Sequence, residues 1–226
     1  MTHLITCKNL SVGHERNKVA GPFSLEINSG DYLCVIGENG SGKSTFMKTI
    51  LGLITPIEGS IEHDDSFNAK EIGYLAQQTQ VQKDFPSSVE EVVLSGFVSH
   101  LGRRWFYNKK EKELAKEYMA KTGVDKLAKH CYRDLSGGQQ QRTLLARALC
   151  AADKMILDEP AAGLDPDAMQ YMYDLIAKLN KEGMTIVMIT HDVPAVVQYA
   201  NRIVRFVDGT VKEVSTDEYR KVVEKC

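Results

Sequence analysis

The sequence has few cysteines, and they form no recognisable set. The five cysteines are odd in number and widely separated, without the short spacings of a metal site or the even count of a secreted disulfide framework. They are Cys7, Cys34, Cys131, Cys150 and Cys226. We therefore expect reduced thiols in a cytosolic protein.

Long apolar runs and a marked excess of charge are also missing. No stretch approaches the roughly 20 apolar residues that span a bilayer, and residues 1–10 lack the basic segment and apolar core of a secretory signal. The formal net charge is −2 at pH 7, which argues against a nucleic-acid partner, although a local basic patch is compatible with it. If the protein works at a membrane, another subunit must span it.

What the sequence does contain is an alternation of strands and helices. Its 226 residues, 43% of them hydrophobic, suffice for one packed domain. Apolar and β-branched segments predict strands at residues 4–12, 19–27, 32–36, 71–76, 155–157, 185–189, 202–207 and 210–214, with Ile61 in another. Helical spacing of apolar residues predicts helices at 44–51, 167–181 and 193–199. This order indicates an α/β fold with a mainly parallel sheet flanked by helices.

A helical segment interrupts the alternation. Residues 86–129 show helical spacing, and another helix is expected to begin at Ser136. We expect a single domain over residues 1–226, with a core of about 1–85 and 150–226 and a helical subdomain of about 86–149. Near the end, Asp208-Gly209 predicts a hairpin, and Ser215 with Glu218 predicts a capping box that starts a last helix.

A glycine-rich loop follows the predicted strand at residues 32–36. Residues 37–44 read Gly-Glu-Asn-Gly-Ser-Gly-Lys-Ser and match the phosphate-loop pattern in full. The glycines let backbone N–H groups surround a phosphate, and the following helix directs its positive end at the same anion. Lys43 would reach the β- and γ-phosphates, and the Ser44 hydroxyl would bind Mg²⁺. The binding residues predicted here are Gly37, Asn39, Gly40, Ser41, Gly42, Lys43, Ser44 and Thr45.

Two carboxylates end the apolar strand at residues 155–157. Asp158 and Glu159 follow it directly, and side chains at the carboxyl ends of parallel strands face the ligand crevice. Asp158 is therefore placed to hold Mg²⁺, and Glu159 to align and polarise an attacking water.

A second helix start has the features of an anion site. Residues 135–139 read Leu-Ser-Gly-Gly-Gln, so Ser136 offers a hydroxyl and Gly137 and Gly138 expose N–H groups. One chain cannot easily bring this site and the phosphate loop onto one γ-phosphate. An isologous dimer can, because each copy presents one of the two sites to the other.

Taken together, these motifs resemble the nucleotide-binding subunits of the ATP-binding cassette superfamily. Residues 37–44 resemble its Walker A motif, 135–139 its signature and 155–159 its Walker B motif. The resemblance spans nearly the whole chain and adds three residues: Gln77 of the Q-loop, which senses Mg²⁺ and the γ-phosphate, Asp165 of the D-loop at the dimer interface, and His191, the switch histidine. It also implies an antiparallel β subdomain. The expected catalytic residues are Glu159, His191 and Gln77. Nucleotide would also contact Ser136, Gly137, Gly138, Gln139 and Asp165, and Mg²⁺ would be bound by Ser44, Gln77 and Asp158.

One position departs from the family pattern. The family stacks adenine on an aromatic residue near the end of the first strand, and this position is His14 here, with Val19 as an apolar edge. An imidazole offers less stacking area than tyrosine.

The resemblance further implies ATP and Mg²⁺ as cofactors and a homodimer that sandwiches two ATP molecules. It implies membrane-spanning permease subunits, an extracytoplasmic substrate-binding protein and a place on the inner face of the cell membrane. Phe85, Pro86 and the apolar residues 98–106 are candidates for the permease-docking surface or, equally, for subdomain core.

The cargo and the class of machine leave alternatives open. Residues 90–96, 100–102 and 139–142 resemble the zinc and manganese uptake branch, although the chain need not bind the metal itself. The chain could instead serve another cargo or act as a nucleotide-gated interaction module outside transport. A small-molecule kinase would lack the Ser136 motif, and a chromosome-maintenance ATPase would carry long heptad coils.

Overall fold

The computed structural model describes residues 3–15, 17–64, 72–76, 86–152 and 154–223. The chain divides into two compact units, unit 1 (Met1–Ala69 and Ala177–Cys226) and unit 2 (Lys70–Ile176). Gln77 and Phe85, which were singled out in the sequence, lie outside the described residues.

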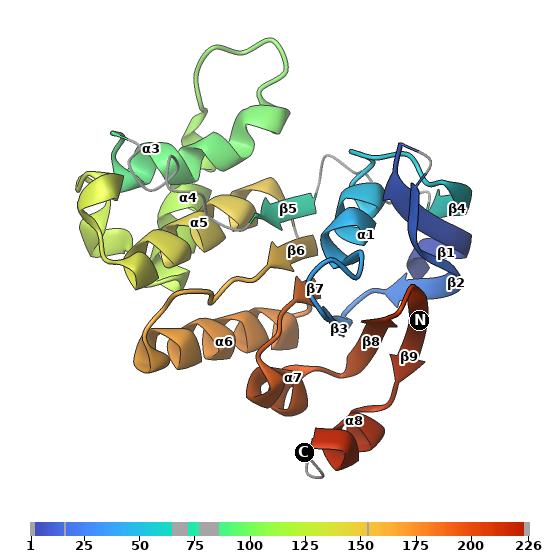
Figure 1. Ribbon diagram of the computed structural model, residues 1–226. Coiled ribbons are helices and arrows are strands. Elements are labelled where there is room, and N and C mark those ends of the chain that lie inside the picture. Colours follow the sequence, from blue (N-terminus) through green and yellow to red (C-terminus); the bar gives the residue numbers. More distant parts are fainter. Residues whose placement is uncertain (1–2, 16, 65–71, 77–85, 153, 224–226) are drawn as a thin grey trace. The chain divides into compact units, whose positions relative to one another are not determined.

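Unit 1 contains an antiparallel sheet in the order β2-β1-β4 (Figure 1). Its strands are β1 (His3–His14), β2 (Asn17–Asn28) and β4 (Glu58–His63). Strand β2 alternates buried and exposed residues from Phe23 to Ile27, as expected for a strand with one face on the core. The antiparallel β subdomain implied by the family resemblance is therefore present.

The remaining strands of unit 1 run in the order β7-β3-β8-β9. Strand β3 (Tyr32–Gly37) lies parallel to both β7 (Thr185–Ile189) and β8 (Arg202–Val207), whereas β9 (Thr210–Val214) returns antiparallel to β8. The helices are α1 (Lys43–Ile50), α7 (Val193–Tyr199) and α8 (Thr216–Val223). The predicted hairpin at Asp208-Gly209 and the capping box of Ser215 and Glu218 are confirmed.

Unit 2 combines two parallel strands with a helical group. Strand β5 (Ile72–Leu75) pairs in parallel with β6 (Lys154–Asp158). The helices are α3 (Val89–Leu94), η2 (Ser95–His100), α4 (Lys109–Lys121), η3 (Asp125–Leu127), η4 (Tyr132–Asp134) and α5 (Gly137–Ala151). Helix α6 (Pro166–Lys181) begins in unit 2 and ends in unit 1.

The helical group of unit 2 has its own apolar core. Val93, Phe97, Met119 and Ala146 are all buried in one cluster that joins α3, η2, α4 and α5. The sequence predicted helix across residues 86–129, and the structure interrupts it with a loop at residues 101–108. Gly102, with φ of 57°, turns the chain there, and Asn108 caps the next helix.

The mainly parallel α/β fold predicted from the sequence is confirmed. The division into a core of about 1–85 and 150–226 and a helical subdomain of about 86–149 stays a prediction. Among the described residues, no helix combines the length and the apolar character needed to cross a membrane.

Candidate active site

The phosphate loop joins β3 to α1 through left-handed glycines. Gly40 and Gly42 have φ of 81° and 103°, a region that glycine adopts without steric cost. Gly37 has φ of 148°, and a Cβ there would lie 2.3 Å from the Phe206 carbonyl oxygen. The loop conformation therefore requires the glycines that the phosphate-loop pattern contains.

Lys43 lies within this loop rather than in solvent. Its side chain is buried, and Nζ donates to the carbonyl oxygens of Gly37 and Glu38, each at 2.7 Å. The first turn of α1 has no side-chain cap and no acidic residue. The ammonium group and the first N–H groups of the helix thus give the loop an electropositive end.

The two hydroxyl residues after Lys43 differ in environment. Ser44 is exposed in the first turn of α1, as a metal-binding hydroxyl requires. Thr45 is buried, and its Oγ1 lies 3.2 Å from Nε2 of His14 at the end of β1. This contact ties the candidate adenine-stacking residue to the phosphate-binding helix.

Val19 lies beside the same helix start. A Cβ on Gly42 would come within 3.1 Å of Val19 Cγ1, so β2 closes one side of the loop. His14 is exposed, and its ring edge is engaged by Thr45. His14 and Val19 therefore both lie beside the phosphate loop, and their predicted contact with adenine stays a prediction.

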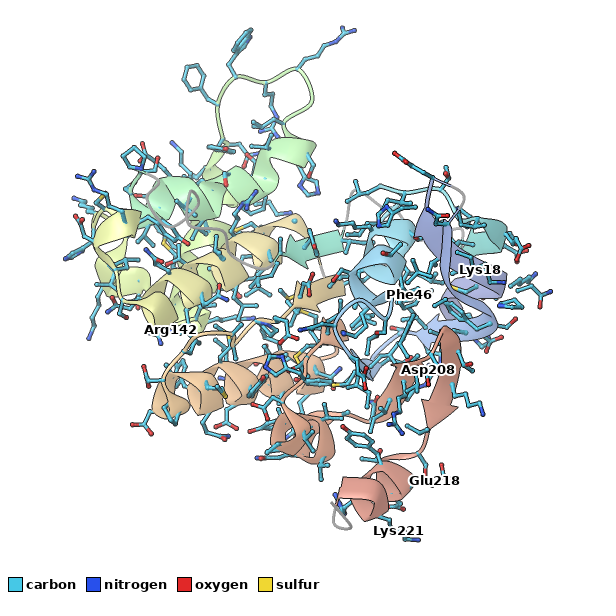
Figure 2. All side chains as sticks on the ribbon, viewed as in Figure 1. Lys18, Phe46, Arg142, Asp208, Glu218 and Lys221 are labelled. Carbon is cyan, nitrogen blue, oxygen red and sulfur yellow. The ribbon has the colours of Figure 1, made fainter. Side chains whose placement is uncertain are left out.

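An aromatic cluster supports the loop from below. Phe46 of α1, labelled in Figure 2, packs against two other rings. Its ring centroid lies 5.5 Å from that of Phe23 of β2 and 5.6 Å from that of Phe206 of β8. Phe23 and Phe206 are 5.9 Å apart, so the three rings contact one another. The cluster fixes α1 against two strands and holds the loop in one place.

His191 follows the strand next to the phosphate loop. Val35 of β3 pairs with Ile189 of β7 in parallel register, so Gly37 and His191 each come two residues after this pair. Asp192 then caps α7 by accepting from the Ala195 N–H at 3.0 Å. Within unit 1, the structure places the predicted switch histidine at the same sheet edge as the phosphate loop.

In unit 2, Asp158 is the last residue of β6 and Glu159 follows it directly. Asp158 is buried at the strand end, and Glu159 has φ of 51°, which is strained backbone for a non-glycine residue. Burial raises the pKa of Tyr74, and the Asp158 charge raises it further, so the Asp158 carboxylate lies near β5. Gln77 follows the end of β5 and lies outside the described residues.

The signature segment forms a capped and exposed helix start. Ser136 Oγ accepts from the Gln139 N–H at 3.3 Å, and the Gln139 Oε1 accepts from the Ser136 N–H at 3.0 Å. Ser136 and Gly137 are exposed. Because the hydroxyl oxygen serves the cap, its proton remains available to donate to an anion.

Gly138 has a packing role that sequence reasoning missed. It is buried, and a Cβ there would lie 3.1 Å from the Ala168 Cβ of α6. Asp165 caps that helix, with Oδ1 accepting from the Ala168 N–H at 2.9 Å. The signature and the D-loop therefore contact through α6, which no local sequence signal indicates.

Gln141 makes a second contact that the sequence did not reveal. Its Nε2 donates to the Pro160 carbonyl oxygen at 3.0 Å and so ties α5 to the turn after Glu159. Arg142, one residue on and labelled in Figure 2, places its guanidinium carbon 5.0 Å from the centroid of the Tyr171 ring. Both contacts join segments about 20 to 30 residues apart, which periodicity cannot detect.

The four described cysteines are free thiols, in agreement with the expectation from the sequence. Burial raises the pKa of Cys7 and of Cys150 to about 12 each. Both thiols stay protonated near neutral pH and are poor nucleophiles, so neither is a candidate for catalysis.

Comparison with known proteins places this geometry in a family. The family model described as "ABC transporter" matches residues 21–162. The manganese transport system ATP-binding protein MntB of Bacillus subtilis is 38% identical over 84% of this chain and 78% of its own length. The zinc uptake system ATP-binding protein ZurA of Listeria monocytogenes is 33% identical over 97% of this chain and 89% of its own length.

Solved structures agree. A metal-chelate-type ABC transporter in an inward-facing conformation superimposes with a TM-score of 0.85 at 28% identity, covering 96% of this chain and 85% of that chain. A dimeric ATP-binding cassette bound to ADP and phosphate superimposes with a TM-score of 0.76 at 27% identity, covering 94% and 99%. The chain belongs to the ABC transporter family and is one of its ATP-hydrolysing subunits.

Proposed function

We propose that this subunit uses ATP hydrolysis to drive import of a divalent metal ion, zinc or manganese, through a membrane permease. The observation that carries the proposal is the complete phosphate loop with Lys43 inside it, on a chain whose relatives are named for manganese and zinc transport. The metal is the ion that the permease transports, and this subunit supplies the free energy of ATP hydrolysis.

In this proposal, each ATP phosphate chain lies on the loop at residues 37–45. Lys43 contacts the β- and γ-phosphates, and the N–H groups at the start of α1 contact the β-phosphate. His14 and Val19 border the adenine. His191, at the edge shared with β3, contacts the γ-phosphate and reports its presence.

Mg²⁺ fits the donor chemistry of the predicted ligands. The exposed Ser44 hydroxyl and the Asp158 carboxylate are hard oxygen donors, which Mg²⁺ prefers, and Gln77 would add an amide oxygen. When bound, the ion neutralises charge on the phosphates. Glu159, held in a strained conformation beside Asp158, orients and polarises the attacking water.

The proposed working form is a homodimer in which each nucleotide lies between two copies. Ser136 and Gly137 are exposed, and the Ser136 hydroxyl retains a proton to donate, so this helix start can contact a γ-phosphate of the other copy. Gln139 holds the cap in shape, and Asp165 lies in the neighbouring turn. ATP would close the dimer and hydrolysis would release it.

A pocket in unit 2 is the proposed docking site for the permease. It has a volume of about 360 Å³ and is lined by residues of β5, η2 and α5, including Tyr74, Val98, Leu144 and Arg147. Val98 in this pocket is 56% exposed, and Gln77 comes two residues after the end of β5 in the sequence. A permease segment in this pocket would therefore sense the nucleotide through the Q-loop.

The other proposed partner is an extracytoplasmic protein that delivers the ion to the permease.

Metal uptake by cells tests the proposal. A strain lacking this chain should accumulate less zinc or manganese than its parent, measured with isotopes of both metals and with cobalt and nickel as comparison cargoes. The wild-type gene should restore uptake and Glu159→Gln should not, with Glu182→Gln as the matched control. Unchanged uptake of both metals in the deletion strain would contradict the metal assignment, while purified chain that still hydrolyses ATP would leave the family assignment standing.

A further inference from the structure

The loop between η2 and α4 exposes two adjacent aromatic side chains. Trp105 is 90% exposed and Phe106 is 84% exposed, the highest values among the large hydrophobic residues that the structure describes. Figure 1 shows this loop as a green segment that extends away from the helices of unit 2. Two neighbouring rings left in water lose the free energy that burial would give them, so such a patch suggests a contact surface.

Hydrogen bonds hold this loop in a defined shape. The Arg104 guanidinium donates to both carboxylate oxygens of Glu111, at 2.6 and 3.1 Å, and to the His100 carbonyl oxygen at 3.1 Å. The Asn108 N–H donates to the same carboxylate at 2.7 Å. Tyr107 packs inward against the helical core, so the two preceding rings are presented outward by a braced loop.

Basic residues surround the two rings. Residues 103–113 contain two arginines and three lysines against two glutamates, in a chain with a net charge of −2. Arg104 forms an ion pair with Glu111, and Nζ of Lys109 lies 3.8 Å from Oε1 of Glu113. The exposed Arg103, Lys110 and Lys112 therefore give this loop a local positive charge. Aromatic rings flanked by arginine and lysine are typical of segments that lie in the headgroup region of a membrane.

We propose that this aromatic tip, defined as Trp105 and Phe106 with Arg103 and Lys110, binds the surface of an anionic lipid bilayer directly. The rings enter the interface between headgroups and acyl chains, and the basic side chains contact lipid phosphates. Neither Trp105 nor Phe106 lines the pocket of unit 2. A projecting loop suits a soft, flat and negatively charged surface, and this lipid contact goes beyond the proposed docking to a permease.

Fluorescence of the chain alone tests the proposal, because Trp105 is its single tryptophan. The purified full chain is titrated with vesicles of phosphatidylcholine and with vesicles that also contain phosphatidylglycerol, without nucleotide or permease. The phosphatidylglycerol vesicles should shift the emission to shorter wavelength and allow quenching by brominated acyl chains. The effect should weaken as salt screens the basic residues.

Matched variants separate the tip from the rest of the surface. Phe106→Ser retains the fluorophore and should weaken binding to the anionic vesicles about tenfold. Lys110→Gln should weaken it about fivefold, since one basic residue near an anionic surface contributes that much. Leu53→Ser removes an exposed apolar side chain of unit 1 and should leave binding unchanged. Circular dichroism verifies that each variant is folded.

Three results would overturn the proposal. One is an emission spectrum that anionic vesicles do not change, and another is equal loss in Phe106→Ser and Leu53→Ser. The third is a shift that occurs only when permease is present, which would assign the tip to a protein partner. None of these results bears on ATP hydrolysis or metal uptake, so the lipid contact can fail while the proposed function stands.

Discussion

In unit 1, the groups expected to meet phosphate are backbone N–H groups and one buried lysine, held over a packed aromatic cluster. In unit 2, these groups are the side chains of Asp158 and Glu159 at the end of β6 and the exposed start of helix α5 at Ser136. The first arrangement resists movement, because the left-handed glycines and the contacts of Phe46 fix it. The second depends on caps and on one strained residue, Glu159.

This difference separates binding from chemistry. A cradle of fixed N–H groups holds any triphosphate that reaches it, since the donors need no rearrangement. A carboxylate that polarises water must be placed correctly but adds little to nucleotide affinity. Damage to unit 1 should therefore reduce affinity, and damage to unit 2 should reduce turnover.

The largest expected effect is that of Glu159→Gln. The amide cannot accept a proton from water, so ATP turnover should fall about a thousandfold while ATP affinity is retained. Steady-state phosphate release and equilibrium binding of a labelled ATP measure the two quantities, and size-exclusion chromatography should show an ATP-bound dimer. Near-normal hydrolysis in this variant, with Glu182→Gln as control, would remove Glu159 from the mechanism.

Lys43→Ala, in unit 1, should lower the affinity for ATP. Loss of the ammonium group from the loop should weaken ATP binding about a hundredfold, because no other side chain of the loop carries positive charge. Isothermal titration measures the affinity. Lys48→Ala, on the exposed face of the same helix, is the control. If both variants bind ATP equally well, the phosphate loop is not the principal nucleotide contact.

Alanine substitution of a glycine should lower the free energy of unfolding more in the phosphate loop of unit 1 than at the helix start of unit 2. Gly37→Ala puts a Cβ 2.3 Å from a backbone oxygen at a positive φ and should cost about 2–4 kcal/mol. In Gly138→Ala the new Cβ would lie 3.1 Å from the Ala168 Cβ and 3.7 Å from Arg142 Nη1, and the helix favours alanine, so the two effects should cancel to within about 1 kcal/mol. Urea denaturation of the two variants measures the difference. Equal losses would mean that the loop of unit 1 is no more constrained than the helix start of unit 2.

The smallest effect concerns acid stability of unit 2. The hydrogen bonds from Arg104 hold the pKa of Glu111 below its ordinary 4.5, so this carboxylate binds protons more weakly in the folded chain than in the unfolded one. Its contribution is complete above about pH 4.5 and is lost as the pH falls through the folded pKa. Thermal melts of Glu111→Gln should therefore depend less on pH between 5 and 3 than those of Glu113→Gln. Identical pH profiles would show that the brace of the loop adds nothing.

Much of this arrangement is readable from the sequence where the signal is local. The phosphate loop, the helix start at Ser136 and the hairpin at Asp208 each depend on neighbouring residues, and the structure contains all three. The parallel sheet follows from the alternation of strand and helix patterns. The family resemblance then supplied roles for Asp165 and His191, which no spacing rule gives.

The remainder depends on contacts between distant residues. The bond between His14 and Thr45 joins residues 31 apart, and the packing of Gly138 on Ala168 joins two helices, so neither leaves a periodic trace. The helical spacing of the neighbouring residues predicts helix at residues 101–108, and this prediction is wrong. Hydrogen bonds between Arg104 and Glu111, seven residues apart, close it instead.

The left-handed backbone of Glu159 has a consequence for protein engineering. Glycine adopts φ near 51° without the cost of about 1–3 kcal/mol that a side chain incurs there, so Glu159→Gly should tolerate heat better than the natural chain. The same change removes the group proposed to activate water. A variant library selected only for thermal stability would therefore accumulate variants at this position that no longer hydrolyse ATP, which is a local trade-off between stability and activity.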